Sequence, residues 1–177
     1  MNKIVAYCLI IIIASSSVYS QENNPVPFTT AEKRLESFKH RLELQENSLL
    51  GNVELKSIGP TVMSGRVVDI DVSPYDPTHF YVAYASGGLW KTTNNGISFK
   101  PIFDNEASMT IGDIAVDWKN STVYVGTGEN NSSRSSYAGT GIYKSTNDGI
   151  DWQHLGLTET HRTGRIIIDP NNPERIG

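Results

Sequence analysis

Residues 88–99 of the chain read Gly-Leu-Trp-Lys-Thr-Thr-Asn-Asn-Gly-Ile-Ser-Phe, and residues 141–152 read Gly-Ile-Tyr-Lys-Ser-Thr-Asn-Asp-Gly-Ile-Asp-Trp. Six of these twelve positions are identical. The sequence upstream of each copy repeats as well, because Arg66-Val-Val-Asp-Ile-Asp-Val-Ser-Pro74 is matched by Gly112-Asp-Ile-Ala-Val-Asp117 and by Arg165-Ile-Ile-Ile-Asp-Pro170. Two different sequence segments that recur in the same order indicate an internal repeat.

The length of the repeat predicts its fold. Gly65 and Gly112 occupy equivalent positions that are 47 residues apart. Short β-type runs alternate with Gly, Pro, Asn and Asp, as expected for short strands joined by turns. Units of about 45 to 50 residues with four strands are typical of β-propeller blades. We therefore predict an all-β fold of four-stranded antiparallel blades, with the first blade at about 57–104, the second at about 108–158 and the start of a third at about 161–177.

The repeated segments 88–99 and 141–152 resemble the Asp box, or BNR repeat, whose pattern is Ser/Thr-x-Asp/Asn-x-Gly-x-Ser/Thr-Trp/Phe. Asp151 departs from this pattern, and both copies carry Asn in place of Asp. In such a turn the Asx side chain bonds back to the turn, Gly supplies positive φ and the aromatic ring packs on the sheet. The resemblance implies a structural hairpin away from the central channel, formed by Thr92, Asn94, Gly96, Phe99, Ser145, Asn147, Gly149 and Trp152.

Longer stretches resemble the opening blades of large secreted proteins with sortilin-type propellers, often labelled BNR-repeat or glycosyl-hydrolase-like. The resemblance covers about residues 55–177 and implies a ring with more blades, so that this chain would be an N-terminal fragment. The segments that carry it are Ser57-Ile-Gly-Pro60, Ser64-Gly-Arg66, Ala85-Ser-Gly-Gly-Leu-Trp-Lys91, Phe103-Asp-Asn105 and Gly126-Thr-Gly-Glu-Asn-Asn131.

The N-terminal region predicts export. Residues 1–20 have a basic start, a short apolar run and a small-residue end, which is the order of a Sec signal peptide cleaved after Ser20. An uncleaved anchor is the alternative, but the apolar run is short for a membrane span. We expect a secreted protein with no stable span after cleavage. Residues 21–54 then form a linker, with a lead-in helix at about 30–45.

Two patterns predict this helix. Thr29 and Glu32 have the spacing of a capping box, and Leu35, Phe38 and Leu42 recur on one helical face. Such a stripe usually packs against the main domain, and docking of a partner is the alternative.

Composition excludes several classes of partner and site. The net charge of −4 leaves no excess of basic residues of the kind that nucleic-acid binding requires. The single cysteine, Cys8, lies in the signal peptide, so the mature chain has no disulfide, cysteine nucleophile or cysteine metal site. The four histidines lack metal-ligand spacing, and we expect neither a metal nor another cofactor.

Candidate binding residues lie at the heads of the inner strands and in the longest loop. Arg66 and Arg165 occupy equivalent positions, where a guanidinium could hold a carboxylate ligand or form a salt bridge with the neighbouring blade. The extra residues of the second repeat lie between its second and third strands, and repeat insertions often form a binding face. The polar side chains of this loop could bind a sugar or a peptide, or could have no binding role. They are Glu129, Asn130, Asn131 and Arg134.

Two function classes follow. The first is a secreted propeller that binds a protein, peptide or glycan through its loop face or channel, with no catalytic residues in this segment. The second is an Asp-box glycoside hydrolase acting on polysaccharide, which needs a pair of carboxylates. In a xyloglucan-cleaving family with similar opening blades, a catalytic Asp precedes the Gly-Gly pair by two residues. Ala85 stands at that position here and argues against this activity at this site.

Overall fold

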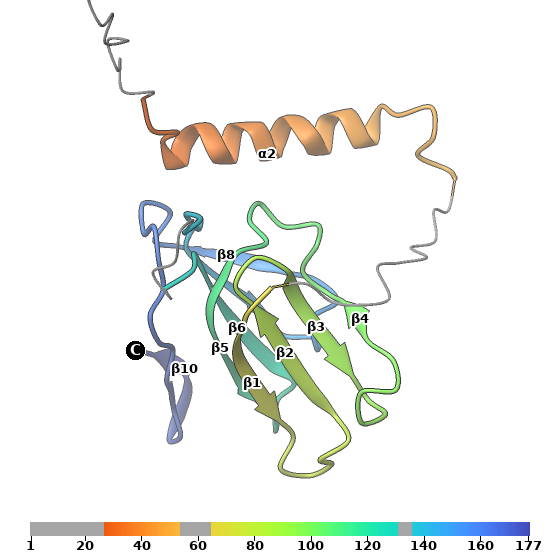
Figure 1. Ribbon diagram of the computed structural model, residues 1–177, viewed down its shortest axis with the longest axis vertical. Coiled ribbons are helices and arrows are strands. Elements are labelled where there is room, and N and C mark those ends of the chain that lie inside the picture. Colours follow the sequence, from red (N-terminus) through yellow and green to blue (C-terminus); the bar gives the residue numbers. More distant parts are fainter. Residues whose placement is uncertain (1–26, 54–64, 131–135) are drawn as a thin grey trace, which may run out of the picture.

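The computed structural model describes residues 27–53, 65–130 and 136–177. The described residues form one α-helix and ten β-strands, which follow one another along the chain in the order shown in Figure 1: α2 (Ala31–Glu46), β1 (Val67–Val72), β2 (Phe80–Tyr84), β3 (Gly88–Thr92), β4 (Lys100–Pro101), β5 (Ile111–Asp117), β6 (Thr122–Thr127), β7 (Ile142–Ser145), β8 (Gln153–Gly156), β9 (Ile168–Asp169) and β10 (Asn172–Ile176).

The strands form two four-stranded antiparallel sheets, in the order β1-β2-β3-β4 and β5-β6-β7-β8, and a pair of β9 with β10. Both four-stranded sheets carry a register irregularity at the same place in the innermost strand, between Val67 and Asp69 in β1 and between Ile111 and Asp113 in β5. The register therefore makes Gly112 equivalent to Val68 in the repeat, and the predicted equivalence of Gly112 with Gly65 is wrong. The prediction of an all-β fold with four-stranded antiparallel blades is confirmed. We call β1–β4 blade 1, β5–β8 blade 2 and the β9–β10 pair blade 3.

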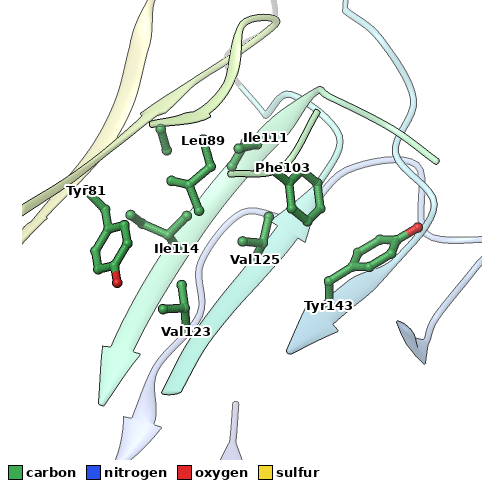
Figure 2. Packing of buried hydrophobic residues seen from close by; sticks show 9 residues of the cluster. Tyr81, Leu89, Phe103, Ile111, Ile114, Val123, Val125 and Tyr143 are labelled. Atoms are coloured by element: carbon green, nitrogen blue, oxygen red, sulfur yellow. The ribbon is translucent and has the colours of Figure 1, made fainter. Parts of the chain in front are cut away.

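The main hydrophobic core lies between blades 1 and 2 (Figure 2). Tyr81 and Leu89 of blade 1 are fully buried, as are Val123 and Val125 of blade 2. Phe103 bridges the two blades, because its ring meets that of Tyr143 edge to face with 5.3 Å between centroids. Full burial of one such side chain contributes roughly 1.5–3 kcal/mol, so this contact fixes one blade on the other.

The two box turns, residues 92–99 and 145–152, have matching hydrogen bonds. In the first turn, the Thr92 hydroxyl accepts from the Gly96 N–H at 3.0 Å, and Asn94 Oδ1 accepts from the Ser98 N–H at 3.0 Å. Gly96 has a φ of 80°, which favours glycine at this position. The ring of Phe99 then packs edge to face on Phe80.

The second turn repeats this geometry despite its sequence departure. Ser145 Oγ accepts from the Gly149 N–H at 2.9 Å, and Asn147 Oδ1 accepts from the Asp151 N–H at 2.9 Å. The Asp151 carboxylate accepts from Asn147 Nδ2 at 2.9 Å, as the Ser98 hydroxyl does from Asn94 in the first turn. Asp therefore replaces Ser without loss of the contact.

Helix α2 lies across the end of the blades that carries the β4–β5 and β6–β7 loops (Figure 1). The N-cap is Thr30, whose hydroxyl accepts from the Lys33 N–H at 3.3 Å. The predicted capping box of Thr29 and Glu32 is therefore wrong by one residue, and Lys33 stands where the box needs an acid. Two arginines hold the helix: the Arg34 guanidinium donates to the Gly139 carbonyl at 3.0 Å, and Arg41 donates to the carbonyls of Asn105 and Glu106.

Most of the helix surface stays in contact with solvent. Leu35 and Phe38 are half-buried and Leu42 is exposed, so the apolar stripe makes only partial contact with the blades. The expected signal peptide, residues 1–20, lies outside the described residues. Within the part of the chain that the structure describes, no helix is long and apolar enough to cross a membrane.

Candidate functional site

Arg66 and Glu129 form an ion pair that joins blade 1 to the β6–β7 loop. Arg66 immediately precedes β1, and Glu129 follows β6 by two residues. The Glu129 side chain is 2% exposed and that of Arg66 is 49% exposed. A buried carboxylate needs a partner, and Arg66 supplies the charge that compensates it. Two residues predicted as ligand contacts therefore contact each other.

Arg165 also lies beside a carboxylate of the neighbouring blade. Its Nη1 is 3.6 Å from Oδ1 of Asp113, which is buried in blade 2. The other carboxylate oxygen of Asp113 accepts from the Ile166 N–H at 2.6 Å. Burial raises the pKa of Asp113, and this outweighs the opposing effects of the Ile166 N–H and Arg165. Both arginines thus lie beside a carboxylate of a neighbouring blade, which was one of the two sequence alternatives. The prediction that they occupy equivalent positions is wrong. The Ile166 N–H bonds Asp113 as the Ile114 N–H bonds Asp69, so Arg165 corresponds to Asp113 and not to Arg66.

The β6–β7 loop is held close to the blades at both of its described ends. The Gly128 N–H donates to the Thr110 carbonyl at 2.8 Å, and the Gly139 N–H donates to the His161 carbonyl at 2.9 Å. Between them, Asn130 is exposed beside Gly164. The other two predicted contacts, Asn131 and Arg134, lie outside the described residues.

The innermost strands carry aspartates whose role the sequence did not reveal. Asp69 and Asp71 lie on β1, and their carboxylates accept from the N–H groups of Ile114 and Val116 on β5, at 3.4 and 3.1 Å. Asp113 of β5 bonds the Ile166 N–H ahead of β9 in the same way. The innermost strand of a blade has one edge without a strand partner, and unpaired N–H groups on an edge are costly if buried. These side chains satisfy that edge.

Asp71 makes a second contact across the blade boundary, since its Oδ1 accepts from the indole Nε1 of Trp118 at 2.6 Å. Burial raises the pKa of Asp71, against the effect of the bonds from Trp118 and Val116. The signal available in the sequence was the alternation of Asp69 and Asp71 on one side of a strand. Asp113 lies inside β5 and bonds the next blade.

An open groove follows the innermost strands. It has a volume of about 320 Å³ and is lined by Asp69, Asp71, Ala115, Arg165 and Ile167. The groove is polar because the edge-binding aspartates and Arg165 surround it. Asp71, whose pKa burial raises, borders this groove.

At the opposite end of the blades, Asp148 joins the second box turn to blade 1. Its carboxylate accepts from the Tyr81 hydroxyl and from Lys91 Nζ. Burial opposes ionisation, but the bonds from Lys91 and Tyr81 outweigh it and lower the pKa of Asp148. The imidazole of His79 lies 3.9 Å from the same carboxylate. This cluster connects two blades and was not predicted, because Asp148 occupies an unspecified position of the box pattern.

Comparison with known proteins supports the fold but no specific family or function. No protein-family model and no curated protein matches the chain. An ancestral GH74 enzyme superposes with a TM-score of 0.53 at 22% identity, over 66% of this chain and 16% of that one. The GH74 enzyme of Niastella koreensis gives 0.45 at 19% identity, over 58% and 16%. The GH74 xyloglucanase from Xanthomonas campestris gives 0.42 at 16% identity, over 55% and 16%.

This chain has the fold of β-propeller blades. It spans about a sixth of the length of each GH74 structure. At these identities the likeness concerns the fold alone. The described residues hold no group of three or more His, Cys, Asp or Glu side chains that could bind a metal ion.

Proposed function

We propose that this chain belongs to a secreted, Asp-box β-propeller protein that binds a protein, peptide or glycan ligand at the loop end of the blades. Further blades complete the ring and the binding face. Export rests on the signal-like order of residues 1–20, and the Asp-box assignment rests on the matching hydrogen bonds of the two box turns. Sortilin-type propellers are the binding precedent that the sequence resembles.

The observation that carries the proposal is the β6–β7 connection, which is longer than its counterpart in blade 1. Main-chain bonds at Gly128 and Gly139 anchor its described ends, and Asn130 faces solvent. An exposed amide beside such an anchor can bind a polar ligand at low entropic cost. Asn131 and Arg134 continue the same polar segment and are proposed contacts by sequence.

The charges at this end favour an uncharged or mixed-charge ligand. Arg66 and Arg165 each face a buried carboxylate, Glu129 and Asp113 respectively. Because these positive charges are compensated within the protein, an acidic ligand would compete with an internal partner for each of them. Neutral glycans and polar peptides are therefore the first ligands to test.

The experiment compares Asn130→Ala with Asn171→Ala on glycan and peptide arrays. Asn171 is an exposed residue of the β9–β10 turn, where only its main-chain N–H bonds Asp169. We expect the secreted protein to bind a subset of array ligands and Asn130→Ala to weaken that binding about tenfold, the effect of about 1.4 kcal/mol. Asn171→Ala should bind as the parent does. Equal binding by all three proteins would refute a role for this loop.

Glycoside hydrolysis is the second candidate, because a carboxyl group of raised pKa is suited to act as a general acid on a glycosidic bond. Asp71 borders the groove of the innermost strands and has such a pKa. Its bonds to Val116 and Trp118 and the buried Ala85 near the head of β3 favour a binding role instead. Release of reducing ends from neutral polysaccharide, abolished in Asp71→Asn, would establish hydrolysis.

A further inference from the structure

The turns β1–β2, β5–β6 and β9–β10 border an open groove at the end of the blades opposite to α2 (Figure 1). The groove has a volume of about 550 Å³. Small-molecule sites in proteins have volumes of about 300–1,000 Å³, so the groove is large enough for a ligand of this class. The β6–β7 loop lies at the α2 end, where Arg34 bonds the Gly139 carbonyl. The groove is therefore separate from the proposed ligand site.

Tyr75 of the β1–β2 turn supplies one aromatic ring to this groove. Its side chain is 72% exposed, so the ring is accessible to a ligand. The turn is fixed, because Ser73 Oγ accepts from the N–H groups of Tyr75 and Asp76, both at 3.2 Å. Pro74 and Pro77 restrict the backbone on either side. Contact with this ring therefore orders little further main chain, which lowers the entropic cost of binding.

Trp118 of the β5–β6 turn supplies a second ring and is half-buried. Its indole Nε1 donates to Asp71 Oδ1 at 2.6 Å, and its ring meets that of His79 edge to face with 4.9 Å between centroids. These contacts fix the orientation of the ring. Because its one donor already has a partner, Trp118 offers a ligand an apolar ring surface and no hydrogen-bond donor.

Two half-buried aspartates of the groove retain capacity to accept hydrogen bonds. The Asp117 carboxylate accepts from the main-chain N–H groups of residues 119 and 120 and from Asn120 Nδ2. The Asp169 carboxylate accepts from the Asn171 N–H at 2.9 Å and lies 3.9 Å from Arg175 Nη1. A carboxylate has about four acceptor positions, so each aspartate can accept from at least one further donor. Hydroxyl groups of a ligand can supply these donors.

We propose that this groove binds a neutral oligosaccharide, with sugar rings stacked on Tyr75 and Trp118. A sugar ring combines an apolar C–H face, which stacks on an aromatic ring, with hydroxyl groups at its rim, which donate to carboxylates. This combination matches the two rings and the two acceptor aspartates of the groove. An acidic sugar fits less well, because Asp117 and Asp169 outnumber Lys119 among the lining residues.

A proline-rich peptide is the alternative occupant, since such peptides dock in aromatic-lined grooves. Its backbone carbonyls need donors, and the indole N–H of Trp118 already bonds Asp71. The aspartates, which only accept, cannot bond these carbonyls. The chemistry of the groove therefore favours the sugar.

Isothermal titration calorimetry of the full-length protein tests the proposal with cellotetraose, mannotetraose, xylotetraose and maltotetraose. We expect at least one of these neutral tetrasaccharides to bind and Tyr75→Ala to weaken that binding about tenfold or more. Tyr75→Phe keeps the ring and should bind within about twofold of the parent. The matched control is Phe28→Ala, since Phe28 is 75% exposed ahead of α2 and its loss should leave binding unchanged. Circular dichroism checks that each variant is folded.

The proposal is overturned if no tetrasaccharide binds, if Tyr75→Ala binds as the parent does, or if Phe28→Ala loses as much affinity as Tyr75→Ala. Binding of tetragalacturonic acid or of a polyproline peptide alone would overturn it as well. Asn171→Ala should bind as the parent does, because both rings and the Asp169 carboxylate remain. Binding that Asn130→Ala loses and Tyr75→Ala retains would place the sugar at the β6–β7 loop. That result would overturn the groove site while leaving the proposed loop site intact, so the two proposals can fail separately.

Discussion

Gly126 of β6 shows how closely the connection into blade 3 packs on blade 2. A Cβ at this position would lie 2.2 Å from Cγ2 and 2.6 Å from Cβ of Thr163. Thr163 cannot simply rotate away, since its buried hydroxyl donates to the Thr127 carbonyl at 3.0 Å. We expect Gly126→Ala to lower the free energy of unfolding by about 1–3 kcal/mol, as overpacking does.

Urea denaturation followed by tryptophan fluorescence measures this effect. Gly164→Ala is the matched control, because its nearest neighbour, Asn130 Nδ2, would lie 3.4 Å from the new Cβ. The control should change the stability by less than about 0.5 kcal/mol. Similar midpoints for the two variants would show that the Thr163 segment adjusts without cost.

The hydrogen bonds of Asp148 predict how the stability of the fold depends on pH. Hydrogen bonds from Lys91 and Tyr81 outweigh burial and hold its pKa below the ordinary value. The ionised group therefore stabilises the fold at pH values above the ordinary aspartate pKa of about 4, and this stabilisation is lost as the pH falls through the lower folded-state pKa. We expect Asp148→Asn to cost about 1 kcal/mol at pH 7, a modest value because the side chain is partly exposed.

The substitution isolates the charge, because Asn95 occupies the same place in the first box turn with a similar positive φ. Urea midpoints of the parent and of Asp148→Asn should converge as the pH is lowered from 5 to about 2.5. A gap that stays constant across this range would mean that the carboxylate charge plays no part.

At the scale of elements, α2 rests on the blades through few contacts. Arg34 and Arg41 donate to carbonyls of the β6–β7 and β4–β5 loops, while most of the helix is exposed. Replacing both arginines by Ala should speed hydrogen exchange of the α2 amides by about tenfold and leave β5 and β6 unaffected. The exposed Lys39 provides the control, since Lys39→Ala should change neither. Unchanged exchange in α2 would show that its apolar side chains suffice to hold it.

The sequence predicted the elements that depend on local chemistry. The box turns follow from Thr, Asn and Gly within eight residues, and the four-strand order follows from a period repeated along the chain. Even the helix start was missed by only one residue, because Thr29 and Thr30 are both competent caps. The pairing of Arg66 with Glu129 lies beyond such reasoning, because it depends on how one sheet is placed against the next.

The same limit explains why the inter-blade aspartates were not recognised. Asp71 and Trp118 are 47 residues apart, and only the stagger between β1 and β5 brings the carboxylate to the indole. The box pattern specifies no residue type at the position of Asp148, so it predicted no role for this side chain. Residues that join blades can therefore be recognised only once the blades are placed in three dimensions. Residues that build a single blade can be recognised from the sequence repeat.

At the scale of the whole molecule, the junction of blades 2 and 3 depends on Asp113. Its buried carboxylate accepts from the Ile166 N–H, and burial raises its pKa. In contrast to Asp148, this group is easier to protonate in the folded state than in the unfolded state. The stability of the parent should therefore decrease as the pH rises from about 4 through the folded-state pKa, as far as this residue is concerned.

Two substitutions separate the charge of Asp113 from its hydrogen bond. Asn keeps an acceptor oxygen for the Ile166 N–H without a charge, so the stability of Asp113→Asn relative to the parent should improve as the pH rises from 4 to 7. Ala removes the acceptor and leaves a buried N–H unpaired, which should cost about 1–3 kcal/mol at any pH. Urea midpoints across this pH range measure both effects. If Asn and Ala are equally destabilising at pH 7, the carboxylate charge itself, rather than its acceptor oxygen, joins the two blades.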